Sequence, residues 1–290
     1  MAAIASGSVR HRPRHPSRWV VTFLAGALCA VWLVPLWILV ITAMKTTPEY
    51  ASNPSQWTLP ENPLRILANI RDAWSAAGLG PGFVASVIYG VVGAALAIIC
   101  ASLGAYSITR LRVRGALFWF VLVFSGTMFP FQMYLIPLFQ MYQTIGLYDT
   151  RVGMICFYTA ISIPFCLLVM RGFFATIPGE LQDAARVDGS GDFGILWRIF
   201  VPLAKGPVAV LFLFQFIWIW NDLVFGLVLS TSDGIRPITP SLAGLQGQYS
   251  SSGPPLVMGG ALIATVPTVL LFLLLGRYLM QGLQLTATRA

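Results

Sequence analysis

Few side chains in this sequence are suited to catalysis or to metal binding. The only two histidines, His11 and His15, lie in a basic N-terminal tail. The four cysteines lie in apolar runs and lack C-x-x-C spacing: Cys29, Cys100, Cys156 and Cys166. Zinc sites and Cys/His catalysis need such groups close together, so we expect no metal site and no catalytic residue. The cysteines are expected to be buried as small apolar side chains.

One segment, Asp188-Gly-Ser-Gly-Asp192, alternates oxygen ligands with small residues, as a cation-binding loop does. A calcium loop of the EF-hand kind also needs glycine at its sixth position and glutamate at its twelfth. Those positions hold Phe193 and Ile199, so we reject calcium binding.

The composition indicates an integral membrane protein. Hydrophobic residues make up 57% of the chain, charged residues 10%, and the mean hydropathy is +0.78. A globular domain carries roughly 25% charged residues. The net charge of +8 could suggest a nucleic-acid partner, but the basic residues flank apolar runs, which is typical of membrane topology. We therefore expect membrane lipid as a partner and no nucleic acid.

Six apolar runs predict an all-α integral membrane protein with about six transmembrane helices. The predicted spans are 19–44, 83–108, 117–142, 152–174, 208–229 and 256–279. A cleaved signal peptide is the alternative for the first run, but this run exceeds the usual 7–15-residue core, so we expect an uncleaved span. Two prolines, Pro130 and Pro137, predict a kinked third span.

The basic residues also predict the orientation of the chain. With cytoplasmic tails at 1–18 and 283–290, thirteen of the eighteen Lys and Arg residues fall on the cytoplasmic side. The positive-inside rule favours this orientation, with both termini cytoplasmic. It also places segment 178–202, which lies between the fourth and fifth spans, in the cytoplasm.

Segment 178–202, called the 178–202 loop below, reads as two short helices joined by a glycine turn. Pro178 suits a helix start, and Asp188-Gly189 suits a helix end, because glycine accepts a positive φ. Ser190 or Asp192 is expected to cap the second helix. Pro202 opposes helix continuation.

The spacing in this loop resembles the EAA motif of ABC importer permeases, written E-A-A, three residues, G, nine residues, I-x-L-P. Here nine residues separate Asp183-Ala-Ala-Arg-Val-Asp-Gly189 from Ile199-Phe-Val-Pro202. Asp183 replaces the motif's Glu and Val201 its Leu. The resemblance implies a permease domain over 19–282 and a cytoplasmic coupling helix that docks on an ATPase. The coupling residues it implies are Asp183, Ala184, Ala185, Asp188, Gly189 and Pro202.

Two further groups are candidates for a substrate path or an outer loop. Trp220-Asn221-Asp222 lies in an apolar run, where polar side chains are costly and often functional. The alternative is a polar cluster at a helix end with an aromatic belt. Gln246, Gln248 and Tyr249 lie in a predicted outer loop, 230–255, and suit either sugar hydroxyls or any solvated loop.

The resemblance, chiefly to carbohydrate permeases of the maltose type, also implies the function. This chain would form half of a pathway for a sugar or sugar-like solute, in a bacterial or archaeal plasma membrane. It contains no G-x-x-x-x-G-K-[ST], so it is expected to bind no cofactor and to be no enzyme. ATP and Mg would be used by a partner ATPase dimer. A second permease and an extracytoplasmic binding protein complete the expected assembly.

Two alternatives stay open at this stage. An ion-gradient-driven secondary transporter would need ionisable groups inside the membrane, for which Asp222 is the candidate. A membrane-embedded hydrolase would need a nucleophile with a base or a zinc motif such as H-E-x-x-H, which the sequence lacks. The sequence does not indicate which sugar is carried.

Overall fold

The computed structural model describes residues 18–53, 55, 57–76, 78–111, 113–246 and 253–287. All regular structure in these ranges is helical, which confirms the predicted all-α class. The long helices are α1 (Arg18–Ala43), α8 (Arg151–Thr176), α15 (Pro254–Ala287) and a continuous helix, Leu79–Arg110, which comprises α4 (Leu79–Ile88), the π-helical η1 (Tyr89–Gly93) and α5 (Ala94–Arg110). This last one is called the 79–110 helix below.

The shorter elements connect these helices or cover their ends. They are α2 (Thr47–Ser52), α3 (Arg65–Ala76), α6 (Ala116–Ser125), η2 (Gly126–Met128), η3 (Phe131–Tyr134), α7 (Leu135–Ile145), α9 (Gly179–Val187), α10 (Asp192–Ile195), η4 (Leu196–Phe200), α11 (Val201–Leu203), α12 (Lys205–Trp220), α13 (Val224–Leu229) and α14 (Ile238–Gly244). In the described ranges four helices are long and apolar enough to cross a membrane, and two bent helix pairs bring the candidates to six.

Two of the predicted spans are interrupted. In the third, Ala116–Met128 meets Phe131–Ile145 at 93°, so the chain is sharply bent at Pro130 rather than gently kinked. Pro137 lies in the first turn of α7, where a missing N–H is tolerated. The run 208–229 is not one helix: α12 ends at Trp220, and α13 begins three residues after Asn221.

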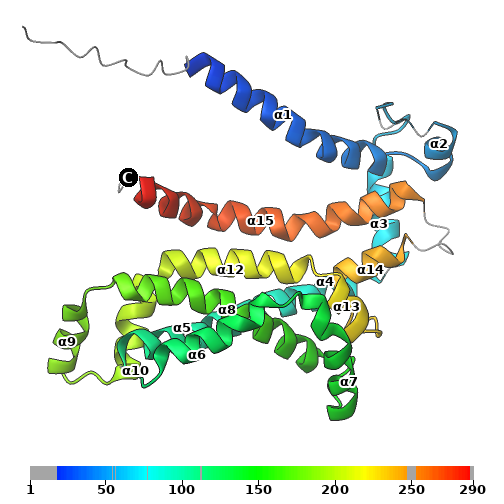
Figure 1. The fold of residues 1–290 in the computed structure, drawn as a ribbon. Coiled ribbons are helices and arrows are strands. Elements are labelled where there is room, and N and C mark those ends of the chain that lie inside the picture. The colour runs from blue at the N-terminus through cyan, green and yellow to red at the C-terminus, as the bar shows by residue number, and fades with distance from the viewer. Residues whose placement is uncertain are drawn as a thin grey trace, which may run out of the picture.

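The core is built around α5, α8 and α12. The 79–110 helix packs along α8 and against α12, and α15 covers the other side of α12 (Figure 1). At Gly90 the approach is so close that a Cβ atom would lie 2.7 Å from the Phe216 ring. Cys166 is buried in this core as predicted, whereas the other three cysteines are exposed on the apolar exterior.

The exterior of the bundle is apolar, as lipid contact requires. Helix α1 lies at its edge, and Trp19, Val31 and Trp32 are all more than 60% exposed. Such large apolar side chains are stable on an outer surface when lipid chains replace water there.

The two ends of the bundle carry different elements. Helices α9 and α10 project from one end, here called the α9 end, and α2, α3, α13 and α14 cover the opposite end, here called the α14 end (Figure 1). Residues 45–80, which lie between the first two predicted spans, contain α2 and α3. Buried Asn69 of α3 donates to the carbonyls of Ala43 and Lys45 at 2.8 Å each, which fixes α3 against the end of α1.

Replacement of Gly153 by alanine is expected to destabilise the fold. A Cβ atom at Gly153, in the first turn of α8, would lie 2.2 Å from the backbone oxygen of Leu147. Relief requires movement of backbone, which costs about 1–3 kcal/mol or more. Gly172→Ala is the matched control, because a Cβ atom on Gly172 of the same helix meets nothing within 4 Å. Thermal unfolding of the two purified variants should show a lower midpoint for Gly153→Ala only.

Candidate functional site

The 178–202 loop folds as two short helical segments joined at Gly189. Helix α9 ends at Val187, and Gly189 has a φ of +82°, which favours glycine. The Ser190 N–H donates to the carbonyl of Ala185 at 2.9 Å and closes the turn. This is the predicted helix–glycine–helix arrangement.

The predicted cap of the second helix is wrong. Gly191 occupies the N-cap position of α10, and no side chain caps it. Asp192 instead pairs with Arg186 of α9 at 2.8 Å, an ion pair that crosses the turn. Pro202 lies inside the one-turn helix α11, one residue before the chain bends by 77° into α12.

The loop presents one face outward and packs the other inward. Of the residues expected to couple to an ATPase, Asp183, Ala184, Asp188, Gly189 and Pro202 are exposed, and Ala185 is buried in the core. The structure also exposes three apolar side chains that the sequence analysis did not single out: Leu181, Val187 and Phe193. Val187 is 89% exposed, so this face presents apolar side chains among charged ones, and nothing in the described chain covers them.

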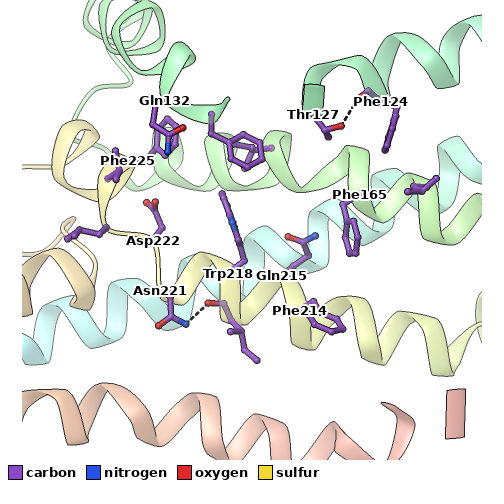
Figure 2. A pocket seen from close by; sticks show the side chains of 16 residues that line it. Phe124, Thr127, Gln132, Phe165, Phe214, Gln215, Trp218, Asn221, Asp222 and Phe225 are labelled. Carbon is purple, nitrogen blue, oxygen red and sulfur yellow. Dashed lines mark hydrogen bonds between the residues drawn. The ribbon is translucent and has the colours of Figure 1, made fainter. Parts of the chain in front are cut away.

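A cavity of about 940 Å³ lies between α8, α12 and the broken segment around Pro130 (Figure 2). Its walls are mostly aromatic and aliphatic, with a few polar side chains among them. The residues that line it are Phe124, Thr127, Phe131, Gln132, Ile161, Phe165, Leu168, Phe214, Gln215, Ile217, Trp218, Asn221, Asp222, Leu223, Val224 and Phe225. Small-molecule sites usually have this size and this mixture.

The polar groups of the cavity are held in place by backbone and by Tyr158. One Asp222 carboxylate oxygen accepts from the Tyr158 hydroxyl and from the Gly226 N–H, both at 2.9 Å. The Asn221 side-chain amide donates to the Ile217 carbonyl at 2.8 Å. The backbone N–H groups of Val224 and Phe225 also interact with the Asp222 carboxylate. The Asn221 side-chain oxygen remains as an acceptor, so the cavity can bind a hydroxyl group beside aromatic rings.

The predicted Trp220-Asn221-Asp222 group is divided between two surroundings. Asn221 and Asp222 follow the end of α12 and line the cavity, so they are both a helix-end cluster and part of a candidate path. Trp220 is 1% exposed and lies on the opposite side of α12. Its indole N–H donates to the Ala264 carbonyl at 2.9 Å, and its ring stacks on Phe216. It belongs to the core and not to an aromatic belt.

Among the cavity residues that the sequence analysis missed, three stand out as candidate contacts with a solute: Trp218, Gln215 and Gln132. Trp218 lies two positions before Trp220, on the other face of α12, and Gln215 lies nearly one helical turn before Trp218. Gln132 comes from η3, after the break. A polar residue inside an apolar run was the available signal for both glutamines. Of the outer-loop candidates, Gln246 is an exposed turn residue, and Gln248 and Tyr249 lie outside the described residues.

Comparisons with known proteins agree with this arrangement. Residues 93–284 match the family described as "Binding-protein-dependent transport system inner membrane component". The chain belongs to this family. Its relatives include the melibiose/raffinose/stachyose import permease protein MelC of Bacillus subtilis, 31% identical over 95% of this chain and 98% of that protein. The diacetylchitobiose uptake system permease protein NgcG of Streptomyces coelicolor is 30% identical over 84% of this chain and 79% of that protein.

A solved bacterial ABC transporter involved in alginate import shares the fold of this inner-membrane component. The TM-score is 0.75 at 21% identity, over 92% of this chain and 99% of that chain. Membership in the family confirms the resemblance based on the 178–202 loop and places the chain among membrane components of transport systems. It disfavours both a membrane-embedded hydrolase and a gradient-driven carrier.

At the α14 end of this inner-membrane component, Asp149 links the loop between α7 and α8 to the loop that follows α13 through hydrogen bonds. Its carboxylate accepts from the N–H groups of Thr231 and Ser232 at 2.8 and 3.0 Å and from both their hydroxyls. Its φ is +53°, and its own N–H donates to the Leu229 carbonyl at 3.1 Å. Partial burial acts to raise the pKa of Asp149, but these hydrogen bonds outweigh it and hold the pKa below its ordinary value.

Asp149→Asn is expected to lower the stability of the fold at neutral pH. Hydrogen bonds to a charged group contribute about 1.5–3 kcal/mol when buried, so at this partly exposed site we expect about 1 kcal/mol. The folded-state pKa lies below the unfolded one, so the contribution is present above pH ~4 and is lost as pH falls through the folded-state value. Unfolding midpoints should therefore differ between the parent and Asp149→Asn at pH 7 and converge in acid. Asp233→Asn, an exposed carboxylate in the same loop, is the control.

Proposed function

We propose that this chain is a permease subunit of an ATP-driven ABC importer and forms half of the path for a sugar or sugar-like solute. The observation that carries the proposal is the 178–202 loop, a fixed helix–glycine–helix projection whose exposed face carries uncovered apolar side chains. Such a face at the end of a membrane bundle suits docking on a soluble partner. The names of relatives that import melibiose, raffinose and diacetylchitobiose support a sugar as the solute.

The partners follow from this assignment. An ABC ATPase dimer holds ATP and Mg and hydrolyses the ATP, so this chain binds no cofactor and is not an enzyme. Asp183, Ala184, Asp188 and Gly189 face the ATPase, together with Val187 and Phe193, while buried Ala185 seats α9 on the bundle. Pro202 marks the bend at which the loop returns to α12. A second permease completes the path, and an extracytoplasmic binding protein delivers the solute.

The orientation follows from the distribution of charge. The α9 end and both termini are cytoplasmic, in a bacterial or archaeal plasma membrane. Arg110, Arg114, Arg186 and Arg198 lie toward the α9 end, whereas Lys45, Arg65, Arg71, Arg151 and Arg236 lie in elements of the opposite end. This asymmetry satisfies the positive-inside rule.

The cavity of about 940 Å³ is the proposed contact with the solute. The Trp218 ring offers a flat face for a sugar ring, and Gln132, Gln215, Asn221 and Asp222 offer groups for its hydroxyls. ATP-driven closure of the ATPase dimer moves the 178–202 loop and turns the path from one side of the membrane to the other. Gln246, Gln248 and Tyr249 are proposed to contact the binding protein or its solute at the outer face.

Affinity purification of the tagged chain from its native membrane tests this function. We expect mass spectrometry to find a P-loop ATPase and a second multi-span permease, with a binding protein whose bound sugar can then be identified. Gly189→Arg should lose the ATPase. Recovery of this chain alone, still able to take up solute into liposomes without ATP, would replace the importer by a gradient-driven carrier.

A further inference from the structure

Both limbs of the 178–202 loop meet at one side chain of the 79–110 helix. The Arg110 guanidinium donates from one nitrogen to the carbonyls of Phe174 and Ile177, at the point where α8 leads into α9. The same guanidinium lies 5.1 Å from the centre of the Phe200 ring, at the end of η4, where the loop returns to the bundle. Arg110 therefore connects the start and the end of the loop to α5.

An aromatic cluster surrounds this contact. Phe200 packs edge-on against Tyr106 of α5 at 5.1 Å and against Phe174 of α8 at 5.3 Å. All three rings are buried, as is Ile177. A cation over an aromatic face with its hydrogen bonds to backbone carbonyls is a rigid contact in such surroundings, so α5 and the loop are held as one unit.

This region also contains buried polar atoms without hydrogen-bond partners. In the described part of the chain six buried side-chain atoms lack a partner, and three are here: Tyr106 Oη, Arg110 Nε and Trp197 Nε1. The Tyr106 hydroxyl lies near the Asp192 carboxylate of the Asp192–Arg186 ion pair and interacts with it, but not in the geometry of a regular hydrogen bond. Unpaired buried groups are rare in folded proteins, so these three polar atoms are available to accept new partners.

The far end of the 79–110 helix contacts the loops of the α14 end. The Tyr89 hydroxyl donates to the Ile235 carbonyl, and the Ser86 hydroxyl accepts from the Ile238 N–H, both at 2.8 Å. Between the two ends the π-helical η1 touches α12 through Gly90, against Phe216, and through Gly93, against Ile219. One continuous helix thus joins the 178–202 loop, the cavity-bearing helix α12 and the outer loops.

We infer that Arg110 is the positioning residue through which movement of the 178–202 loop enters the 79–110 helix, with Tyr106 supplying a second contact as the loop moves. This inference rests on the proposed function, because the ATPase is what moves the loop. The alternative is that Arg110 only stabilises the fold. The positioning role and the purely structural role predict different results when Arg110 is replaced in an assembled transporter: only the positioning role predicts that nucleotide no longer moves the 79–110 helix.

The test measures that movement in the purified full complex in nanodiscs. Spin labels on Val84→Cys of α4 and Val31→Cys of α1, both exposed positions, report the distance between the 79–110 helix and the edge of the bundle in a background without other cysteines. AMP-PNP is the probe, and ATP hydrolysis is measured on the same samples. We expect AMP-PNP to change this distance in the parent complex.

Arg110→Met should reduce the ratio of shifted to unshifted complexes by about 2- to 30-fold while the ATPase stays bound and active. Arg110→Lys keeps the charge but cannot reproduce the planar contact, so its effect should be intermediate. Tyr106→Phe removes only the unpartnered hydroxyl; it should reduce the shift without lowering the unfolding midpoint. Arg114→Met, an exposed arginine four residues further on, is the control and should change neither measurement.

Three results would overturn the inference. The first is a full AMP-PNP-dependent distance change in Arg110→Met, and the second is no distance change in the parent complex. The third is a lower unfolding midpoint in every Arg110 and Tyr106 variant, with an unchanged distance change in those variants that still assemble. Failure of the proposed function gives a different result, because then no ATPase co-purifies with the parent chain.

Discussion

Gly189→Arg is expected to abolish uptake while leaving membrane insertion intact. A Cβ atom on Gly189 meets nothing within 4 Å, so the arginine side chain projects from the loop without a clash inside this chain. It projects from the exposed face that we assign to the ATPase. A loss of uptake of at least about 100-fold, or about 2.7 kcal/mol, is expected from the failure of docking.

Alanine substitutions distinguish the effect of the backbone conformation at Gly189 from the effect of a large side chain on the docking face. Gly189 has a φ of +82°, a conformation that costs a residue with a Cβ roughly 1–2 kcal/mol. Gly191, two positions away, has a φ of −74° and equally open space. Gly189→Ala should therefore lower uptake and co-purification of the ATPase in part, and Gly191→Ala should change neither. Equal uptake in all three variants and the parent would show that this turn does not dock.

The sequence predicted the long helices because apolar length alone determines them. Four uninterrupted apolar runs coincide within a few residues with α1, the 79–110 helix, α8 and the greater part of α15. The 178–202 loop was equally accessible, since its proline and glycine positions fix local backbone conformation whatever surrounds them. The cap of its second helix could not be predicted, because Asp192 pairs with Arg186 across the turn, a contact that depends on how the two helices meet.

The broken segments and α3 show what apolar length cannot predict. Nothing in 208–229 marks a helix end except Asn221-Asp222, and the break forms because Asp222 accepts hydrogen bonds from Tyr158 of α8 and from the backbone of α13. Helix α3 is too short and too polar for a span, yet Ile66, Asn69, Ile70 and Ala73 recur at helical spacing on its inward side. This helical spacing was a signal in the sequence from which α3 could have been predicted.

The cavity itself could not be predicted, because its lining comes from separate parts of the chain that meet only in the fold. Trp218 and Trp220 illustrate the difficulty. They share one apolar run and one helix, and the sequence gives both the same surroundings. The structure turns Trp218 toward the cavity and Trp220 toward Phe83 and the carbonyl of Ala264.

These two tryptophans give a matched pair with opposite expected effects. Trp218→Ala should lower the rate of sugar uptake about tenfold, or about 1.4 kcal/mol, because the solute loses its flat contact, while the amount of folded chain stays the same. Trp220→Ala should lower stability by about 3–5 kcal/mol, because it empties a fully buried site and removes the side-chain donor to the Ala264 carbonyl. Phenylalanine at either position should give a smaller effect of the same kind.

Uptake per folded complex, together with the unfolding midpoint of each variant, distinguishes the two roles. The solute for this assay is the sugar recovered with the co-purified binding protein. If Trp218→Ala instead loses stability and keeps its uptake per folded complex, the cavity is part of the packing between this chain and its neighbours and not a contact with the solute. If Trp220→Ala loses uptake at an unchanged midpoint, the path runs on the other side of α12, between that helix and α15.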